Sequence, residues 1–375
     1  MQTIIKKVDE NCIDESIIEE AGALLKSGAL VAFPTETVYG LGANALDEEA
    51  AARIYAAKGR PSDYPLIVHI ADMDRLFDIT EDVPKAAVML AEKFWPGPLT
   101  MVLKKNDKVP YGTTGGLDTV AVRMPSHKVA LEMIRHGGGY IAAPSANTSG
   151  RPSPTLASHV ADDLDGIIPM ILDGGAVGIG IESTIVDLTE EVPTILRPGF
   201  ITREMLQEVV GEVHMDQGLM ADAKTPPKAP GMKYRHYAPK EPVYLLEGEA
   251  VALLPELVAK AVAQGIKIGV LCSSAMAAQL PQSPQVQLSC WGDCREQLAG
   301  DLFYLLRDFD RTKPEVILAQ GVSEDGIGLA IMNRLRKAAG YQIITLEKGT
   351  LILKNGKQLP GIMIELEYVN SITRR

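Results

Sequence analysis

Five polar stretches before residue 200 carry side chains that could bind a small charged substrate. Each stretch lies at the end of a short apolar run, and α/β proteins usually place their ligands at the ends of strands. Hydroxyl, guanidinium and ammonium groups gather there, with glycines that allow close backbone approach. The stretches are residues 33–40 (FPTETVYG), 58–62 (KGRPS), 118–125 (DTVAVRMP), 143–155 (APSANTSGRPSPT) and 173–199, which ends in TILRPG.

Arg123 interrupts an otherwise apolar strand. Its guanidinium must be paired there, because an isolated buried charge is too costly. The partner is either an internal aspartate or glutamate, or a substrate carboxylate that the guanidinium binds through two parallel hydrogen bonds. His69 ends another apolar run, and a histidine in such a place is more often structural than catalytic.

The other basic residues suit phosphate groups, although each has an ordinary structural alternative. Lys58 and Arg60 stand at the C-terminus of an expected helix, where the helix dipole alone favours cations, and beside Ser62 they could bind a polyphosphate. Arg197 precedes Pro-Gly and could pair with a surface acid. The threonine hydroxyls of residues 33–40 could simply cap a turn.

Taken together, the five stretches favour electrostatic positioning of a nucleotide over covalent catalysis by the protein. They contain no cysteine and suggest no Ser-His-Asp arrangement, so we expect no catalytic nucleophile. The basic residues that suit phosphate are Lys58, Arg60, Arg123, Arg151 and Arg197.

Composition limits the class of protein. A chain of 375 residues is too long for one hydrophobic core, so we expect two domains. The formal net charge of -11 argues against broad binding to nucleic acids or acidic membranes. We expect a cytoplasmic protein with no membrane partner, because no apolar run approaches membrane-spanning length and the amino end does not resemble a signal peptide.

The four cysteines are too scattered for a disulfide framework, which favours reduced thiols. Cys290 and Cys294 have one residue too many between them for the usual zinc knuckle, so we expect ordinary small core residues there and assign no metal ligands to the protein.

The order of helical and strand patterns predicts an α/β fold with a twisted sheet. Asp14 and Asp47 are expected to cap helices, and further helices are expected at residues 84–94, 126–135 and 155–163. The expected strands between them include ALVAF, PLIVHI, LTMVL, TVAVRM, YIAA, MILD and STIVDL.

The composition changes after residue 212, which divides the chain into four parts. Residues 1–212 form the expected catalytic domain, and residues 213–242 form a proline-rich linker whose large side chains suggest a docked lid over the site. Residues 243–345 alternate helices and strands in a smaller Rossmann-like domain that lacks the GxGxxG fingerprint. Residues 346–375 form a tail without an assigned role, in which Asn355-Gly356 signals a two-residue hairpin.

At these motifs the sequence resembles the Sua5/YrdC/YwlC family of L-threonylcarbamoyladenylate synthases. The resemblance covers a YrdC-like first domain, and APGMKYRHYAP with the domain after it resembles the two-domain Sua5 branch. It rests on FPTETVYGLGANA, KGRP followed by PLIVHI, WPGPLT, VAVRMP, APSANTSG, ESTIVDL and ILRPG, in this order.

The resemblance implies an ATP-dependent nucleotidyltransferase. It would convert L-threonine, bicarbonate and ATP to L-threonylcarbamoyladenylate and diphosphate, with Mg²⁺ accompanying ATP. The product would serve the N6-threonylcarbamoyladenosine modification of position 37 in tRNA (t6A37) through a downstream transferase complex.

Two other functions fit the sequence less well. An RNA-binding module of the YrdC type is disfavoured by the acidic net charge, so direct binding of tRNA is expected to be weak. A carbamoyl-phosphate-using transferase is disfavoured because the chain shows neither the zinc-finger nor the acylphosphatase-like regions of those enzymes.

The resemblance also implies which residues contact the substrates. Lys58, Arg123 and Arg197 would position the substrates, and Mg²⁺ would be held by phosphate oxygens and water, with few protein ligands. L-Threonine is expected against Thr35, His69, Arg123, Ala143 and Ser183. ATP is expected against Lys58, Ser62, Thr119, Ser145, Ser153, Arg197 and Tyr237, with Arg60 and Asn147 in support.

Overall fold

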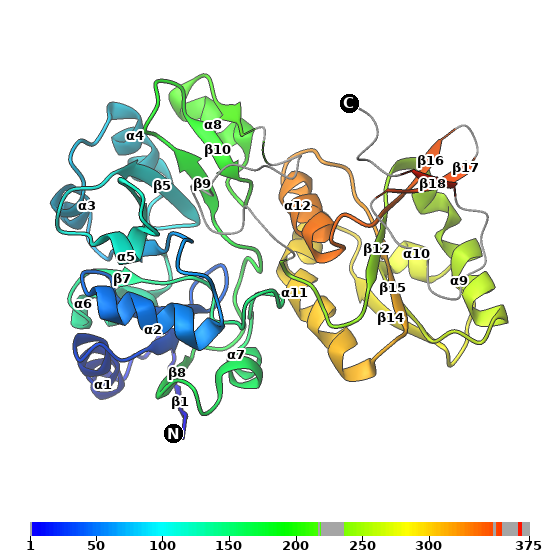
Figure 1. The fold of residues 1–375 in the computed structure, drawn as a ribbon, viewed down its shortest axis with the longest axis horizontal. Helices are drawn as coiled ribbons and strands as arrows, with labels where there is room; N and C mark the ends of the chain where they lie inside the picture. The colour runs from blue at the N-terminus through cyan, green and yellow to red at the C-terminus, as the bar shows by residue number, and fades with distance from the viewer. Residues whose placement is uncertain (1, 217, 219–235, 348–349, 355–366, 370–375) are drawn as a thin grey trace. The chain divides into compact units, whose positions relative to one another are not determined.

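The computed structural model describes residues 2–216, 218, 236–347, 350–354 and 367–369 (Figure 1). The chain forms two compact units. The first consists of Met1–Ser149 and Ser153–Lys233, and the second of Gly150–Pro152 and Tyr234–Arg375. Three residues from the middle of the expected substrate loop therefore belong to the second unit.

In the described part of the first unit, one sheet of eleven strands forms the framework. Their order across the sheet is β1-β8-β2-β3-β7-β4-β6-β5-β9-β10-β11. The strands are β1 (Ile4–Lys7), β2 (Val31–Phe33), β3 (Gly40–Asn44), β4 (Ile67–His69), β5 (Leu99–Lys104), β6 (Thr119–Arg123), β7 (Ile141–Ala142), β8 (Met170–Asp173), β9 (Thr184–Asp187), β10 (Thr194–Arg197) and β11 (His214–Met215).

Helices connect these strands, and their ends follow the capping residues in the sequence. Asp14 and Asp47 accept hydrogen bonds from the backbone of Ser16 and Glu49, which confirms both expected N-caps. Gly59 ends the second of these helices with a φ of 59°. The helices are α1 (Glu15–Lys26), α2 (Glu48–Lys58), α3 (Asp74–Ile79), α4 (Lys85–Phe94), α5 (Tyr111–Thr114), α6 (Lys128–His136), α7 (Ala157–Leu164) and α8 (Arg203–Val210).

The two faces of the first sheet are covered differently. One face packs into the large core, to which Val68, Val122 and Ala142 contribute. On the opposite face, α1 and α6 cover the strands from β8 to β7, and Gly22 allows their close approach because a Cβ there would lie 2.7 Å from Cβ of His136. Farther along, over β4, β6, β5, β9 and β10, this second face carries a small apolar cluster: Ile67, Val102, Ala121, Ile185 and Leu196. We call this part of the sheet the site face.

The second unit is built on a mostly parallel sheet with the order β14-β13-β15-β12-β16-β17-β18. This arrangement and the first sheet confirm the expected α/β class. The strands are β12 (Val243–Leu246), β13 (Ile268–Ser273), β14 (Val286–Trp291), β15 (Val316–Gln320), β16 (Ile343–Glu347), β17 (Thr350–Lys354) and β18 (Glu367–Val369). The connecting helices are the 3-10 helix η2 (Gly248–Leu253), α9 (Leu254–Ala263), α10 (Ser274–Ala277), α11 (Arg295–Thr312) and α12 (Gly328–Ala338).

Three parts of the expected division of the chain can be compared with the described residues: the linker, the tail and the turn within the tail. The linker lies partly outside the described residues, since only 213–216, 218 and 236–242 are described. Part of the expected tail is described: β17 pairs antiparallel with β16, and Ile352 and Leu353 are buried. The expected turn at Asn355-Gly356 lies outside the described residues.

Candidate active site

Strand register places three polar side chains in a row on the site face. His69 in β4 pairs with Arg123 in β6, and Arg123 pairs with Thr100 in β5. Directly paired residues on neighbouring strands point to the same face of a sheet, with their Cβ atoms close together. The row therefore puts an imidazole, a guanidinium and a hydroxyl side by side above the small apolar cluster.

Arg123 is buried and is held by residues 36 and 37. Its Nη2 donates to Oε1 of Glu36 at 2.6 Å, and its Nη1 donates to Oγ1 of Thr37 at 2.9 Å. Its Nε lies 3.4 Å from the carbonyl oxygen of Gly97. Of the two partners open at the level of sequence, the internal acid is thus present, and it is Glu36.

Glu36 is fixed in turn by the backbone around it. Its Oε2 accepts a hydrogen bond from the backbone nitrogen of Ser126 at 3.2 Å, and its own carbonyl accepts one from Ile179 at 2.8 Å. Glu36 lies within a turn that Thr35 closes, since the Thr35 hydroxyl donates to the carbonyl of Val38 at 2.6 Å. The sequence expectation omitted Glu36, although its position between two threonines directly after β2 was a usable signal.

His69 is neutral in this environment. Burial, helped by the positive charge of Arg123, lowers the pKa of the His69 imidazole to about 3. Its Nδ1 donates to the carbonyl of Ile67 at 3.2 Å, and the ring lies edge-on to Phe33. Ala143 adjoins the same strand, because its backbone nitrogen donates to that carbonyl at 2.8 Å.

A β-bulge brings Arg197 to the site face. Ile195 pairs with Val186, but the next pair along the strands is Arg197 with Ile185, so one extra residue lies on β10. Without this shift, the two-residue period of a strand would turn Arg197 toward the opposite face. The sequence marked Arg197 as a candidate but did not predict the bulge that orients it.

Arg197 and Thr100 meet at Ser183, which is fully buried. The Ser183 hydroxyl lies 2.7 Å from Oγ1 of Thr100 and accepts a hydrogen bond from Nη2 of Arg197 at 3.1 Å. Arg197 also donates to the carbonyl of Ser183 from Nε and Nη2, at 3.1 and 2.9 Å. Thr100 is a further site residue that sequence reasoning missed, because its strand reads as plain core.

The loop after β7 is fastened to α2 and to the segment before β9. The buried ammonium of Lys58 donates to the carbonyl oxygens of Ser145 and Asn147. The hydroxyl of Ser145 donates to Oδ1 of Asn147 at 2.5 Å. At the far end of the loop, the buried Ser153 donates to Oε1 of Glu182 at 2.6 Å.

Three expected ATP contacts lie outside this network. Ser62 is exposed, and the guanidinium of Arg60 lies over the ring of Tyr64, 4.8 Å from its centroid. Thr119 begins β6, four residues before Arg123. The even spacing puts both side chains on the same face of the sheet, with about 13 Å of strand between the two residues. The site face therefore extends well beyond the row at His69.

Comparison with known proteins shows which family the chain belongs to. A family model described as Telomere recombination matches residues 23–199, and one described as Threonylcarbamoyl-AMP synthase, C-terminal domain, matches residues 201–340. The threonylcarbamoyl-AMP synthase of Pyrococcus abyssi (strain GE5 / Orsay) is 52% identical over 345 residues, covering 91% of this chain and 99% of the relative. The chain belongs to the threonylcarbamoyl-AMP synthase family.

A further relative in the threonylcarbamoyl-AMP synthase family and a solved structure each match over most of this chain. The Bacillus subtilis (strain 168) enzyme is 48% identical, over 90% of this chain and 96% of its own. The crystal structure of P. abyssi Sua5 complexed with L-threonine matches with a TM-score of 0.87 and 51% identity, covering 92% of this chain and 100% of that one. The expected resemblance and fold are confirmed.

In this member of the threonylcarbamoyl-AMP synthase family, the candidate residue Tyr237 lies in the second unit. It is buried, has a left-handed backbone with a φ of 64°, and stacks on Phe303 at a centroid distance of 5.1 Å. Arg151, expected among the phosphate-suited cations, also belongs to that unit, where it pairs with Asp310 at 2.7 Å.

The described residues contain no group of three or more histidine, cysteine, aspartate or glutamate side chains that could hold a metal ion. Cys290 pairs in register with the buried Cys272 of the neighbouring strand, and the exposed Cys294 precedes α11. Within the described part of the chain, no helix is long and apolar enough to cross a membrane.

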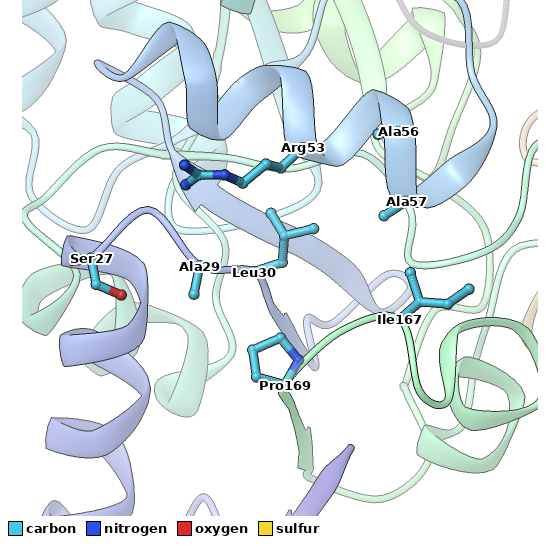
Figure 2. Close-up of a pocket in the computed structure, with 8 residues that line it drawn as sticks. All are labelled: Ser27, Ala29, Leu30, Arg53, Ala56, Ala57, Ile167 and Pro169. Carbon is cyan, nitrogen blue, oxygen red and sulfur yellow. The ribbon is translucent and has the colours of Figure 1, made fainter. Parts of the chain in front are cut away.

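A separate cavity of about 560 Å³ lies in the first unit (Figure 2). It is bordered by the chain after α1, by α2 and by the residues before β8. No candidate site residue is among those that line it, so this cavity is distinct from the site face. The lining residues are Ser27, Ala29, Leu30, Arg53, Ala56, Ala57, Ile167 and Pro169.

Proposed function

We propose that this chain forms L-threonylcarbamoyladenylate and diphosphate from L-threonine, bicarbonate and ATP. The threonine amine reacts with bicarbonate and releases water, or with carbon dioxide and releases a proton, to give a carbamate. A carbamate oxygen then attacks the α-phosphorus of ATP, and diphosphate leaves. No protein nucleophile takes part, so the work of the site is to position two substrates. The observation that most supports this function is the row of His69, Arg123 and Thr100. Ser183 and Arg197 lie beside this row.

The threonine half of the site is proposed around Arg123. A guanidinium has five N–H donors, and the described contacts engage one each on Nε, Nη1 and Nη2. One donor on each terminal nitrogen is then available to a substrate carboxylate. A neutral His69 orients the amino acid without adding a second positive charge, while Thr35, Ser183 and the backbone at Ala143 surround its polar groups.

The solved structure of P. abyssi Sua5 with L-threonine supports this half of the proposal, since that protein is 51% identical over 92% of this chain. Glu36 is proposed to keep the guanidinium of Arg123 in one orientation, because a charge-assisted hydrogen bond of 2.6 Å leaves little rotational freedom.

The ATP half is proposed to lie along the loop of residues 143–155 and the bulge at β10. Lys58 orders the loop through two carbonyl groups, and Arg197 supplies positive charge near the reacting phosphate. The remaining proposed contacts are Ser62, Thr119, Ser145, Ser153 and Tyr237, with Arg60 and Asn147 in support.

Mg²⁺ is proposed to enter with ATP. Mg²⁺ usually keeps several waters and binds through substrate phosphates, so we propose that phosphate oxygens and water hold most of its coordination positions. When bound, Mg²⁺ offsets phosphate charge and favours departure of diphosphate. The protein's part is to hold the triphosphate that carries it.

Release of diphosphate tests the proposal. The purified full-length protein is incubated with Mg²⁺ and ATP, with and without L-threonine and bicarbonate, and diphosphate is measured by a coupled assay. We expect release to depend on both L-threonine and bicarbonate. Release equal to that of the threonine-free control would refute the proposal.

We further propose a cytoplasmic location and delivery of the product to a t6A-forming transferase complex. The alternative function, an RNA-binding module, is not favoured by the net charge of -11. A salt titration of tRNA binding distinguishes a synthase from an RNA-binding module. Tight binding that weakens steeply with salt would favour the alternative.

A further inference from the structure

The cavity in the first unit combines apolar walls with a single cationic side chain (Figure 2). Its volume of about 560 Å³ lies within the range of about 300–1,000 Å³ that small-molecule sites occupy. Apart from Arg53 and Ser27, every residue that lines it is apolar. Such sites usually consist of an apolar pocket with a few polar groups that orient the ligand.

The apolar walls come from α2 and from the chain before β8. Arg53, Ala56 and Ala57 are spaced i, i+3 and i+4, so they lie on one face of α2, and the two short side chains leave the hollow open. Across the cavity, Ile167 is 47% exposed although it is a large aliphatic residue. In Figure 2 the guanidinium of Arg53 lies toward the side of Ser27, whereas Ala57 and Ile167 lie toward the other side. The cavity therefore has a charged end and an apolar end.

The guanidinium of Arg53 is held in place but makes few hydrogen bonds. Its Nη1 donates to the carbonyl of Gly28 at 2.6 Å, the only hydrogen bond of this side chain within the described part of the chain. Gly28 permits this approach, because a Cβ there would lie 2.4 Å from Nη1. A guanidinium has five N–H donors, so most of those on Arg53 remain available to a ligand.

The acid beside Arg53 is a weak partner. Oε2 of Glu49 lies 3.6 Å from Nη2 of Arg53, and the Glu49 side chain is 87% exposed. Exposed ion pairs of this kind contribute little, because water screens the charges and both side chains lose freedom. A ligand carboxylate can therefore take the place of Glu49 at a small cost in free energy.

We propose that this cavity binds a small molecule that has an apolar body and one carboxylate. Two N–H groups of Arg53 hold the carboxylate in parallel, and the body covers Ala57 and Ile167. A carboxylate is favoured over a phosphate because Arg53 is the only charged residue in the described lining, and the chain carries a net charge of -11. None of the candidate substrate contacts lines the cavity, so this site is tested independently of the proposed function.

The test measures binding of octanoate to the full-length protein by NMR. Octan-1-ol serves as the control ligand, because it has the same number of carbons and no charge. The protein carries ¹³C-labelled alanine and isoleucine methyl groups, so that the signals of Ala57 and Ile167 report the place of binding as well as the Kd. Both ligands are titrated into the wild-type protein and into each variant.

The first pair of variants tests the charged end. Arg53→Met removes the donors and keeps an unbranched apolar chain. Arg135→Met makes the same exchange on α6, at an arginine whose side chain is 41% exposed, against 48% for Arg53. We expect Arg53→Met to raise the Kd of octanoate about tenfold, which corresponds to about 1.4 kcal/mol, and to change the Kd of octan-1-ol less than about twofold. Arg135→Met should match the wild type with both ligands.

The second pair of variants tests the apolar end. Ala56→Leu places a larger side chain in the cavity, and Ala52→Leu makes the same exchange at an exposed position of α2 that does not line it. Both positions are exposed and leucine favours helices, so both variants should fold. Ala56→Leu should weaken the binding of octanoate and of octan-1-ol alike, and Ala52→Leu should leave both unchanged.

Saturable shifts of the Ala57 and Ile167 signals with octanoate, together with a selective loss in Arg53→Met, would support the site. Absence of saturable shifts in the wild-type protein would overturn the proposal. An equal loss of both ligands in Arg53→Met would also overturn it, since the arginine would then act only on the shape of the cavity. If Arg53→Met fails to fold, the comparison of Ala56→Leu with Ala52→Leu decides, and equal binding by those two variants would contradict the site.

Discussion

Replacing His69 with asparagine should remove a pH-dependent contribution to the stability of the first unit. The imidazole is buried and its pKa falls to about 3 in the folded protein, against an ordinary value of 6.5. Below pH 6.5 the unfolded chain takes up a proton at His69 that the folded protein does not. Stability is therefore highest above pH 6.5 and decreases as the pH falls toward 3.

The magnitude follows from the two pKa values. Each pH unit between them is worth about 1.4 kcal/mol, so at pH 5 the wild-type protein should have lost about 2 kcal/mol through His69 alone. Asparagine does not titrate, so His69→Asn should lack this loss. Other groups with lowered pKa values, such as His127 and Asp78, are common to both proteins and cancel in the comparison.

The assay can be confined to the first unit. The chain has two tryptophans, of which Trp95 lies in the first unit and Trp291 in the second. In a Trp291→Phe background, the fluorescence of Trp95 reports unfolding of the first unit by urea at each pH from 8 to 5. We expect the stability difference between the proteins with and without the His69→Asn substitution to change by about 2 kcal/mol over this range. A difference that stays constant with pH, or an NMR titration of His69 near pH 6.5, would refute the reasoning.

Three other substitutions test separate parts of the site. Arg123→Lys keeps the charge but loses the planar guanidinium that reaches both Glu36 and Thr37. The Kd of L-threonine should therefore rise roughly tenfold or more, while the Kd of α,β-methylene-ATP changes little. An equal rise in both Kd values would indicate a structural arginine. Gly199→Ala should lower the unfolding free energy of the first unit by about 1–3 kcal/mol, because a Cβ there would lie 2.4 Å from the backbone nitrogen of Thr184. Urea denaturation measures this change, and a variant as stable as the wild type would argue against this packing. Tyr237→Ala should raise the KM for ATP and leave the first unit folded by circular dichroism, and unchanged turnover at low ATP would remove Tyr237 from the nucleotide site.

Local signals in the sequence predicted local structure well. Asp14 and Asp47 precede helical patterns and do cap helices, because the capping interaction involves only neighbouring residues. Arg123 was expected to need a partner, since a buried guanidinium is costly. Which partner it has depends on the approach of residues 36 and 37 to β6, and that is set by the tertiary fold.

Features that depend on register or on distant packing were missed. The bulge in β10 that turns Arg197 to the site face requires one extra residue relative to β9, and nothing in TILRPG marks it. The inclusion of residues 150–152 in the second unit depends on Arg307 and Asp310, more than 150 residues later in the chain. The joining of β17 to the second sheet depends on its pairing with β16, so composition alone left it in an unassigned tail.

The most direct test of the central claim is to identify the product. The wild-type protein is incubated with ATP, Mg²⁺, L-threonine and ¹³C-bicarbonate, and the mixture is analysed by mass spectrometry. We predict threonylcarbamoyl-AMP carrying the label, formed together with diphosphate and absent when L-threonine is omitted. Recovery of unreacted ATP and L-threonine under these conditions, with no labelled adenylate, would contradict the account.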